Sequence, residues 1–291
     1  MPFVAILGAG ELGASVARAI ATRGRVPEVR LIDDASDVAA GKALDLQQAA
    51  PLERSSTQLT ASGDVMAAVG AAVTIVADGA GGAPQGAELA GNAGVALVTR
   101  LTDVDRDAVI LCAGATQHDV IERGLHERHL PRARLFGSAP EAMVQALRAI
   151  VAIEADASPS AVALTVLGRV PDRAVVLWSD ASIAGRPLVR VLEPAQVARL
   201  VRRAALLGPP GPYALAAAAA RAAEMIVAGS RRIVCCTAGL DGEFGLRHGV
   251  ASLPVVLGPG GIVRVVAPPL DVREQVLVEN AIYDKGRAIG R

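Results

Sequence analysis

The chain has 291 residues, and its 29 Lys and Arg balance 29 Asp and Glu, so the formal net charge at pH 7 is zero. A balanced charge predicts partners other than nucleic acid or an acidic membrane surface. A membrane-spanning helix needs about 20 consecutive apolar residues, and charged or turn residues interrupt every candidate stretch, so no span is expected. The N-terminus lacks the basic region of a secretory signal. Alanine is the most abundant residue and aromatic residues make up only 2%, which predicts a core of small side chains.

Three cysteines are an odd number without metal-type spacing: Cys112, Cys235 and Cys236. This usage in a long chain favours a reducing cytoplasm. The adjacent Cys235 and Cys236 lie in an apolar run, which favours a core strand over a redox pair. His126 and His129 share a helix face with Glu122, but two imidazoles without a third nearby ligand do not predict a metal site.

Short apolar runs alternate with helical patterns through the first half, which is typical of βαβ units and a parallel sheet. Strands are predicted at residues 3–7, 29–33, 73–77, 109–112 and 134–136, and helices at 12–22, 35–49, 89–101 and 119–129. After about Glu141 the pattern changes to a long helix, strands at 162–167 and 174–177, an alanine-rich helix from Tyr213 and hairpin-like runs. Segregated strands and helices predict an α+β second domain.

A glycine motif directly follows the first predicted strand. Gly8-Ala9-Gly10-Glu11-Leu12-Gly13 is a complete G-x-G-x-x-G that also opens the first predicted helix. Gly8 makes the tight turn, Gly10 lets the backbone approach a pyrophosphate, and Gly13 allows the helix to pack closely on the strand. The motif in this context predicts a dinucleotide site; the alternative is a glycine-rich turn without a ligand.

The start of this helix and the end of the second strand complete the predicted site. At Glu11 and Leu12 the helix N-terminus faces the phosphates with free N–H groups and the positive end of its dipole. Asp33 follows Gly13 at the spacing of about 20 residues at which a carboxylate accepts hydrogen bonds from the adenosine ribose hydroxyls. Asp33 and the adjacent Asp34 repel a 2′-phosphate, so NAD is predicted rather than NADP.

Several further stretches carry a family resemblance: GKALDLQ at 41–47, LPRARLFG at 130–137, VLG at 166–168, GEFG at 242–245 and LPVVLG at 253–258. With the glycine motif they resemble the lactate/malate dehydrogenases, particularly the lactate dehydrogenase-like bacterial malate dehydrogenases, over nearly the whole chain. The resemblance implies a Rossmann-type doubly wound parallel sheet over residues 1–140 and an α+β substrate-type domain over 141–291. It also implies a homo-oligomer, dimer or tetramer, and cofactor contacts at Gly79 and Asn92.

The family reaction exchanges hydride between NAD and a small 2-hydroxy or 2-oxo acid, and its polar groups are missing here. A histidine takes the hydroxyl proton and an aspartate orients it, while arginines hold the carboxylate and polarise the carbonyl. Carried over by position, Val170 replaces the histidine, Met143 the aspartate, Ala146 the carboxylate-binding arginine and Ala115 the asparagine. The lid over residues 79–88 lacks both expected arginines.

Composition supports these losses without an alignment. The four histidines are His118, His126, His129 and His248, so none lies between residues 130 and 247, where the base belongs. No aspartate occurs from 137 to 155, and Arg54 is the only Arg or Lys from 45 to 98. A shift in register therefore cannot restore the site, and no catalytic residue is assigned.

Three hypotheses follow. The chain is a noncatalytic or regulatory NAD-binding homologue; or it is an NAD-dependent oxidoreductase with altered chemistry, acting on a 2-hydroxy acid or related small molecule; or it has a structural role without nucleotide. The second hypothesis relies on polar residues near the replaced positions: His118, Glu141, Arg148, Arg169 and Asp172. The alternative for each of these residues is that it is a solvated charge or a capping residue without a catalytic role.

Overall fold

A sheet of eleven strands organises the protein, here a computed structural model that describes residues 1–80 and 87–283. Six strands lie parallel in the order β3-β2-β1-β4-β5-β6. Their bounds are β1 (Phe3–Leu7), β2 (Glu28–Ile32), β3 (Gln58–Ser62), β4 (Val73–Val76), β5 (Ile110–Cys112) and β6 (Leu135–Gly137). The strand order reverses between β1 and β4, and sheets of this kind bind ligands beyond the carboxyl ends of the strands at that point.

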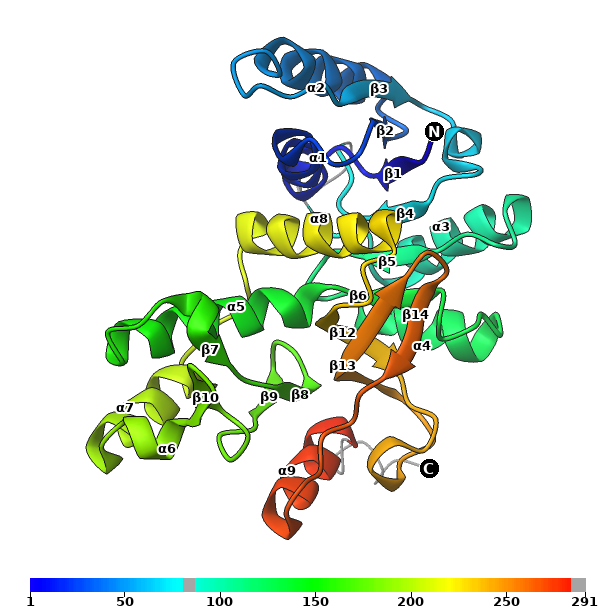
Figure 1. The fold of residues 1–291 in the computed structure, drawn as a ribbon. Helices are drawn as coiled ribbons and strands as arrows, with labels where there is room; N and C mark the ends of the chain where they lie inside the picture. The colour runs from blue at the N-terminus through cyan, green and yellow to red at the C-terminus, as the bar shows by residue number, and fades with distance from the viewer. Residues whose placement is uncertain (81–86, 284–291) are drawn as a thin grey trace.

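Helices cover both faces of the parallel part (Figure 1). They are α1 (Glu11–Arg23), α2 (Ser36–Ala49), α3 (Gly91–Val104) and α4 (His118–Glu127). Side chains alternate across a strand, so β1 contributes to two cores. Val4 and Ile6 lie in the core that includes buried residues of α1 and α2, whereas Ala5 and Leu7 lie in the core of α3 and α4. The doubly wound parallel sheet predicted from the sequence is confirmed.

The predicted elements of the first half agree closely with the observed ones, apart from one omission. Strand β3 was not predicted because its sequence, Gln-Leu-Thr-Ala-Ser, has no apolar run. It forms because it pairs with β2 at the outer edge of the sheet, where its side chains are less buried than those of β1. Neighbouring backbone, rather than local sequence, determines this strand.

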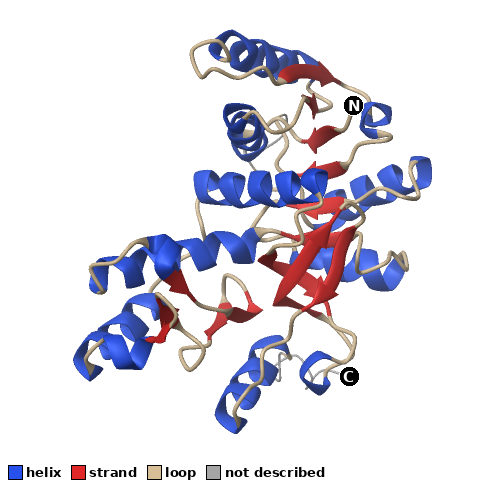
Figure 2. Ribbon diagram, in the orientation of Figure 1, coloured by secondary structure: helices blue, strands red, loops and turns tan. Residues whose placement is uncertain are grey.

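The second half adds antiparallel strands and a smaller sheet (Figure 2). Its strands are β7 (Val162–Ala163), β8 (Val166–Arg169), β9 (Arg173–Val176), β10 (Ser182–Ile183), β11 (Arg186–Pro187), β12 (Ile233–Gly239), β13 (Val250–Gly258) and β14 (Gly261–Val265). Its helices are α5 (Ala139–Glu154), α6 (Leu188–Val191), α7 (Pro194–Ala205), α8 (Pro212–Ala228) and α9 (Val272–Ile282). The single strand predicted over 162–167 is wrong, because β7 pairs in the small sheet while β8 pairs with β13 and β9.

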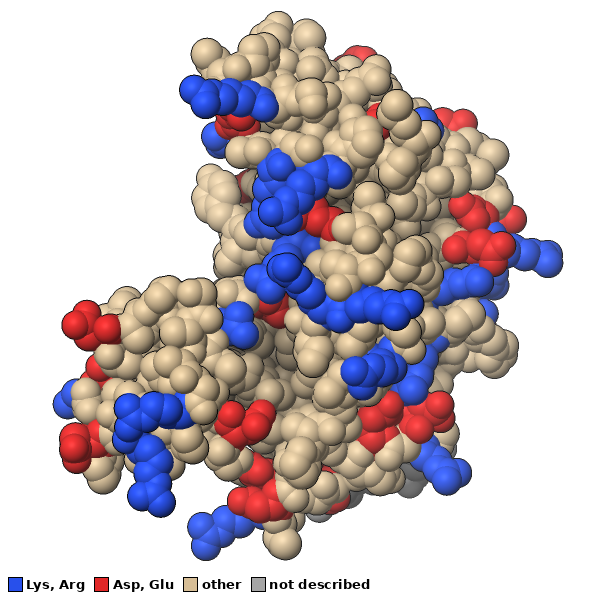
Figure 3. Space-filling model, in the orientation of Figure 1, with Lys and Arg blue, Asp and Glu red and all other residues tan. Residues whose placement is uncertain are grey.

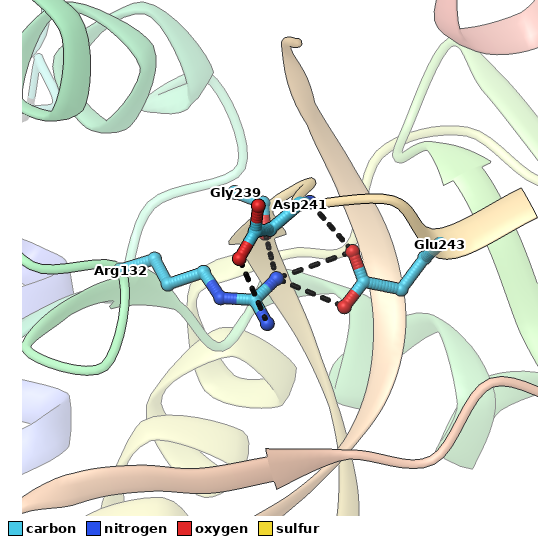
Figure 4. Close-up of polar contacts among 4 residues, drawn as sticks. All are labelled: Arg132, Gly239, Asp241 and Glu243. Carbon is cyan, nitrogen blue, oxygen red and sulfur yellow. Dashed lines mark hydrogen bonds and ion pairs between the residues drawn. The ribbon is translucent and has the colours of Figure 1, made fainter. Parts of the chain in front are cut away.

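The two halves join through the sheet itself. Strand β12 pairs antiparallel with β6 at Thr237 and Gly137, so the large sheet is continuous across the boundary that we predict at residue 140. Arg132, just before β6, ties the loop after β12 to this junction (Figure 4). Its Nη1 donates to the Gly239 carbonyl at 3.2 Å and to both carboxylate oxygens of Glu243 at 2.9 and 3.1 Å.

Helix α8 packs against α1 and α5 in the middle of the molecule (Figure 1). Its alanines 216, 218–220, 222 and 223 are buried, and their small side chains allow the close approach that the composition predicts. Lys and Arg side chains gather over α1 and α8 on the face shown in Figure 3. Arg23, the last residue of α1, and Arg25 pair with the buried Glu224 of α8 at 3.5 and 3.4 Å. Tyr213, at the start of α8, is 76% exposed.

The three cysteines are free and buried. Cys235 and Cys236 lie in β12, as predicted, and burial raises the pKa of the Cys112 and Cys235 thiols to about 12. Within the described ranges, no group of three or more His, Cys, Asp or Glu is arranged to hold a metal ion. No helix in the same ranges is long and apolar enough to cross a membrane.

Candidate cofactor site and active site

A cavity of about 280 Å³ lies beyond the carboxyl ends of β1 and β2, beside the point where the strand order reverses. Gly8, Asp33, Asp34 and Gly79 line one side of it. The opposite side is one face of α3, formed by Ala93, Ala96, Leu97 and Arg100. The cavity is therefore where the glycine motif and Asp33 predict the adenosine of a dinucleotide.

The first and third glycines of the motif have the tight surroundings predicted for them. Gly8 has a φ of +103°, and a Cβ there would lie 2.2 Å from the Asp78 carbonyl oxygen. A Cβ on Gly13 would lie 1.9 Å from the Gly8 carbonyl oxygen. Both positions thus require glycine, Gly8 for the turn and Gly13 for the contact between α1 and that turn.

Asp33 is fixed at the end of β2 and faces the cavity. Its Oδ2 accepts the N–H groups of Ala9 at 2.7 Å and Ala80 at 2.9 Å, and its Oδ1 accepts the Ala35 N–H at 2.9 Å. A carboxylate has about four acceptor positions, so one remains for a ribose hydroxyl. The adenosine end of the site therefore fits NAD.

The phosphate end differs from the prediction, because a carboxylate of this chain already occupies the helix N-terminus. Asp78 Oδ2 accepts the Leu12 N–H at 2.9 Å, and Oδ1 accepts the Gly13 N–H at 2.7 Å. A Cβ on Gly10 would lie 2.3 Å from Asp78 Oδ2, so the space left by the second glycine holds this side chain. The free N–H groups predicted for the phosphates are thus not all free, and the phosphate end as arranged does not fit a pyrophosphate.

Asp78 is a site residue that sequence reasoning missed, although a signal was present. It directly precedes Gly79, for which the resemblance implies a cofactor contact, and it places a carboxylate after the apolar run of β4. Asp78 is 1% exposed, and burial raises its pKa despite the two N–H groups that it accepts.

The remaining predicted cofactor residues divide between the cavity and the surface. Gly79 lines the cavity, Leu12 is buried, and the Glu11 side chain is exposed. Asn92, near the start of α3, is exposed and lies outside the cavity lining; its Oδ1 instead accepts Arg123 Nη1 at 2.8 Å. Most of the lid predicted over 79–88 lies outside the described residues.

Aliphatic side chains fill the region where the family chemistry is expected. Met143 of α5 is 3% exposed and Val170, after β8, is fully buried, and both belong to one apolar cluster with Val144 and Leu147. A neighbouring cavity of about 490 Å³ is lined mainly by apolar residues of α5, β9 and α7, together with Asp172. The Glu141 side chain forms a hydrogen bond inside the fold, in which its Oε2 accepts the Cys235 N–H at 3.0 Å.

One histidine retains an unusual environment. His118 begins α4, and its Nε2 is buried without a hydrogen-bond partner among the described residues. Burial lowers the pKa of His118, the charge of Arg169 lowers it further, and Asp172, Asp119 and Glu88 act in the opposite direction. The fold thus brings His118 into electrostatic contact with Arg169 and Asp172, although these residues belong to the other half of the chain.

His118 predicts a pH dependence of stability. Its folded-state pKa is lowered, whereas the unfolded chain titrates near pH 6.5. The neutral imidazole therefore contributes its full stability above about pH 6.5, and that contribution is lost as the pH falls below this value. Urea unfolding between about pH 7.5 and 5.5 is expected to show a decline that His118→Gln reduces. An unchanged decline in the variant contradicts the assignment.

Comparisons with known proteins agree with this architecture. The sequence model described as lactate/malate dehydrogenase, NAD binding domain, matches residues 3–89. A malate dehydrogenase of Salinibacter ruber is 28% identical over 96% of this chain and 93% of its own length. One from Cytophaga hutchinsonii is 29% identical, with 96% and 94% covered.

Comparison with solved structures also finds similarity to a malate dehydrogenase over nearly the whole chain. The malate dehydrogenase structure from Salinibacter ruber superposes with a TM-score of 0.84 at 26% identity, covering 96% of this chain and 93% of that chain. The glycine motif, the strand order and Asp33 agree with these similarities. The chain is therefore similar to the lactate/malate dehydrogenases over nearly its whole length, and the matched domain model supports NAD as its cofactor.

Proposed function

We propose that the protein is a noncatalytic or regulatory NAD(H)-binding member of this family, which does not oxidise 2-hydroxy acids by the family's route. One observation carries the proposal: Met143 and Val170, at the positions of the catalytic aspartate and histidine, lie together in a buried apolar cluster. A proton carrier and its orienting carboxylate are thus replaced by side chains that neither accept nor donate a proton.

The size of the loss supports this interpretation. A positioned acid or base contributes about 10² to 10⁴ in rate, and an arginine that pairs with a substrate carboxylate contributes further binding that a point charge or alanine does not replace. Such contributions are not additive. Even the smallest of them lowers the expected turnover of malate or lactate by about two orders of magnitude.

The test combines binding with turnover on the same preparation. We expect calorimetry to detect NADH binding, and we expect NADH absorbance to stay at the blank rate with malate, lactate, oxaloacetate and pyruvate. Binding without turnover supports the proposal. Turnover of any of these acids at ordinary dehydrogenase rates contradicts it, and absence of NADH binding up to millimolar concentration removes the NAD(H)-dependent role.

A second candidate function is an NAD-dependent oxidoreductase with altered chemistry. It is favoured by the buried, unpartnered Nε2 of His118 among the described residues and by the nearby charges of Arg169 and Asp172. A neutral imidazole at that place can accept a proton from a substrate hydroxyl. A wider absorbance screen with alcohols, aldehydes and other 2-hydroxy acids tests it: turnover that His118→Gln abolishes establishes this function instead.

The proposal includes a cytoplasmic homo-oligomer, either a dimer or a tetramer. Three free, buried thiols suit a reducing compartment, and the family resemblance suggests the assembly. Light scattering of the purified chain distinguishes monomer, dimer and tetramer.

A further inference from the structure

Asp78 satisfies three N–H groups at the start of α1. Its carbonyl oxygen accepts the Gly10 N–H at 3.0 Å, and its two carboxylate oxygens accept those of Leu12 and Gly13. The first N–H groups of a helix have no partners within the helix, and together with the helix dipole they favour an anion. In this protein that anion comes from its own strand end, just beyond β4.

The same place is where a dinucleotide puts its pyrophosphate. The second glycine of the motif leaves open the approach that a pyrophosphate uses, and Asp78 Oδ2 lies in that opening, 2.3 Å from where a Gly10 Cβ would be. The two groups therefore exclude each other by volume, and their negative charges repel at short range. A pyrophosphate can reach the Leu12 N–H only after the Asp78 side chain has rotated away.

The adenosine end has no such obstacle. Asp78 does not line the cavity of about 280 Å³ next to Asp33. Lys42 Nζ, from α2, donates to the carbonyl oxygens of Ala9 and Gly10 at 2.6 and 3.0 Å. It therefore holds the glycine loop in place through its carbonyl groups, while the carboxylate of Asp78 takes the N–H groups that a phosphate would need.

We propose that Asp78 sets the ligand preference of this site by occupying the pyrophosphate position, so that NAD(H) binds only at the cost of displacing it while an uncharged adenosine binds without displacement. The proposal rests on the proposed NAD(H)-binding function. It assigns to Asp78 the role of an internal competitor, which weakens dinucleotide binding without touching the adenosine pocket.

The experiment compares NADH and adenosine binding in the full chain and three variants. Asp78→Ala removes the competitor, and Asp78→Asn removes its charge while nearly keeping its volume. Asp37→Asn removes one carboxylate from the exposed first turn of α2 and controls for net charge. Calorimetry measures NADH affinity, ligand-observed NMR measures adenosine affinity, and circular dichroism checks that each variant is folded.

We expect Asp78→Ala to bind NADH about tenfold more tightly or better, which corresponds to about 1.4 kcal/mol, with adenosine affinity unchanged. Asp78→Asn is expected to show a smaller gain and Asp37→Asn none. If Asp78→Ala does not fold, the NADH affinity of Asp78→Asn, compared with that of wild type, tests the proposal instead.

Three outcomes overturn the proposal. If the folded Asp78 variants bind NADH no more tightly than wild type does, the carboxylate is not a competitor. If wild type nevertheless binds NADH, the proposed NAD(H)-binding function still stands. An equal gain in Asp37→Asn attributes the effect to net charge. Absence of NADH binding in wild type and all variants overturns the proposal together with the NAD(H)-binding function.

Discussion

Gly13→Ala is expected to destabilise the parallel-sheet half by about 3 kcal/mol or more. The added Cβ would lie 1.9 Å from the Gly8 carbonyl oxygen, which belongs to the backbone. Gly8 has little room to move, because the backbone of Asp78 lies close to it. Helix α1 must therefore move away from β1, which breaks contacts of Val16 and Ile20 in the core. Urea unfolding measures the loss.

Gly41→Ala is the matched control within α2. The position is exposed, its φ is ordinary, and nothing described lies within 4 Å of an added Cβ. Alanine in a helix interior is favoured over glycine by about 0.5–1 kcal/mol, so this variant is expected to be more stable than wild type. Equal effects of the two substitutions would show that helix propensity, rather than the contact with Gly8, governs both.

Met143→Asp, which reinstates the carboxylate of the family pattern, is expected to lower the free energy of unfolding by about 3 kcal/mol or more at pH 7. Met143 is 3% exposed within the apolar cluster of Val144 and Leu147, so the new charge loses its hydration without gaining a partner. Burial raises the pKa of such a carboxyl, so the loss shrinks as the pH falls toward about 4, where the unfolded chain is protonated too.

Met143→Leu keeps the volume and is expected to cost less than about 1.5 kcal/mol. Urea unfolding of both variants at pH 7 and at lower pH separates loss of packing from burial of charge. If the aspartate variant is as stable as the leucine variant, then water reaches position 143 from the neighbouring cavity. That result would favour the altered-chemistry function over the noncatalytic one.

The first half of the fold could be predicted because its elements are determined locally. Strand β1 is uniformly apolar, and α1 begins directly after a glycine motif and ends at Gly24, which adopts the left-handed conformation. Strand β3 could not be found this way, because its pairing with β2 rather than its own composition stabilises it. The break between β7 and β8 was hidden for a similar reason, since an unbroken apolar run does not reveal that the chain changes sheets.

In the candidate site, too, features set by local sequence could be predicted and features set by long-range contacts could not. Gly8, Gly13 and Asp33 were predicted from short-range spacing, and the structure gives each the surroundings that the prediction requires. The contact of Asp78 with Gly13 joins residues far apart in the chain, so the glycine motif itself does not predict it. The sequence indicates for His118 only that it lies near the replaced asparagine position. Its interaction with Arg169 depends on how the two halves of the chain meet.

The pairing of β6 with β12 has a consequence for how the chain is made. Gly137 and Thr237 are partners, yet most of the second half lies between them in the order of synthesis. A ribosome adds about 5–20 residues per second, so β6 waits about 5–20 s for its partner strand after it has been translated. During that interval the nascent parallel sheet carries an apolar, unpaired edge, and unpaired edges attract other chains. The interval before β12 is made is therefore a stage of synthesis at which this edge can pair with other chains.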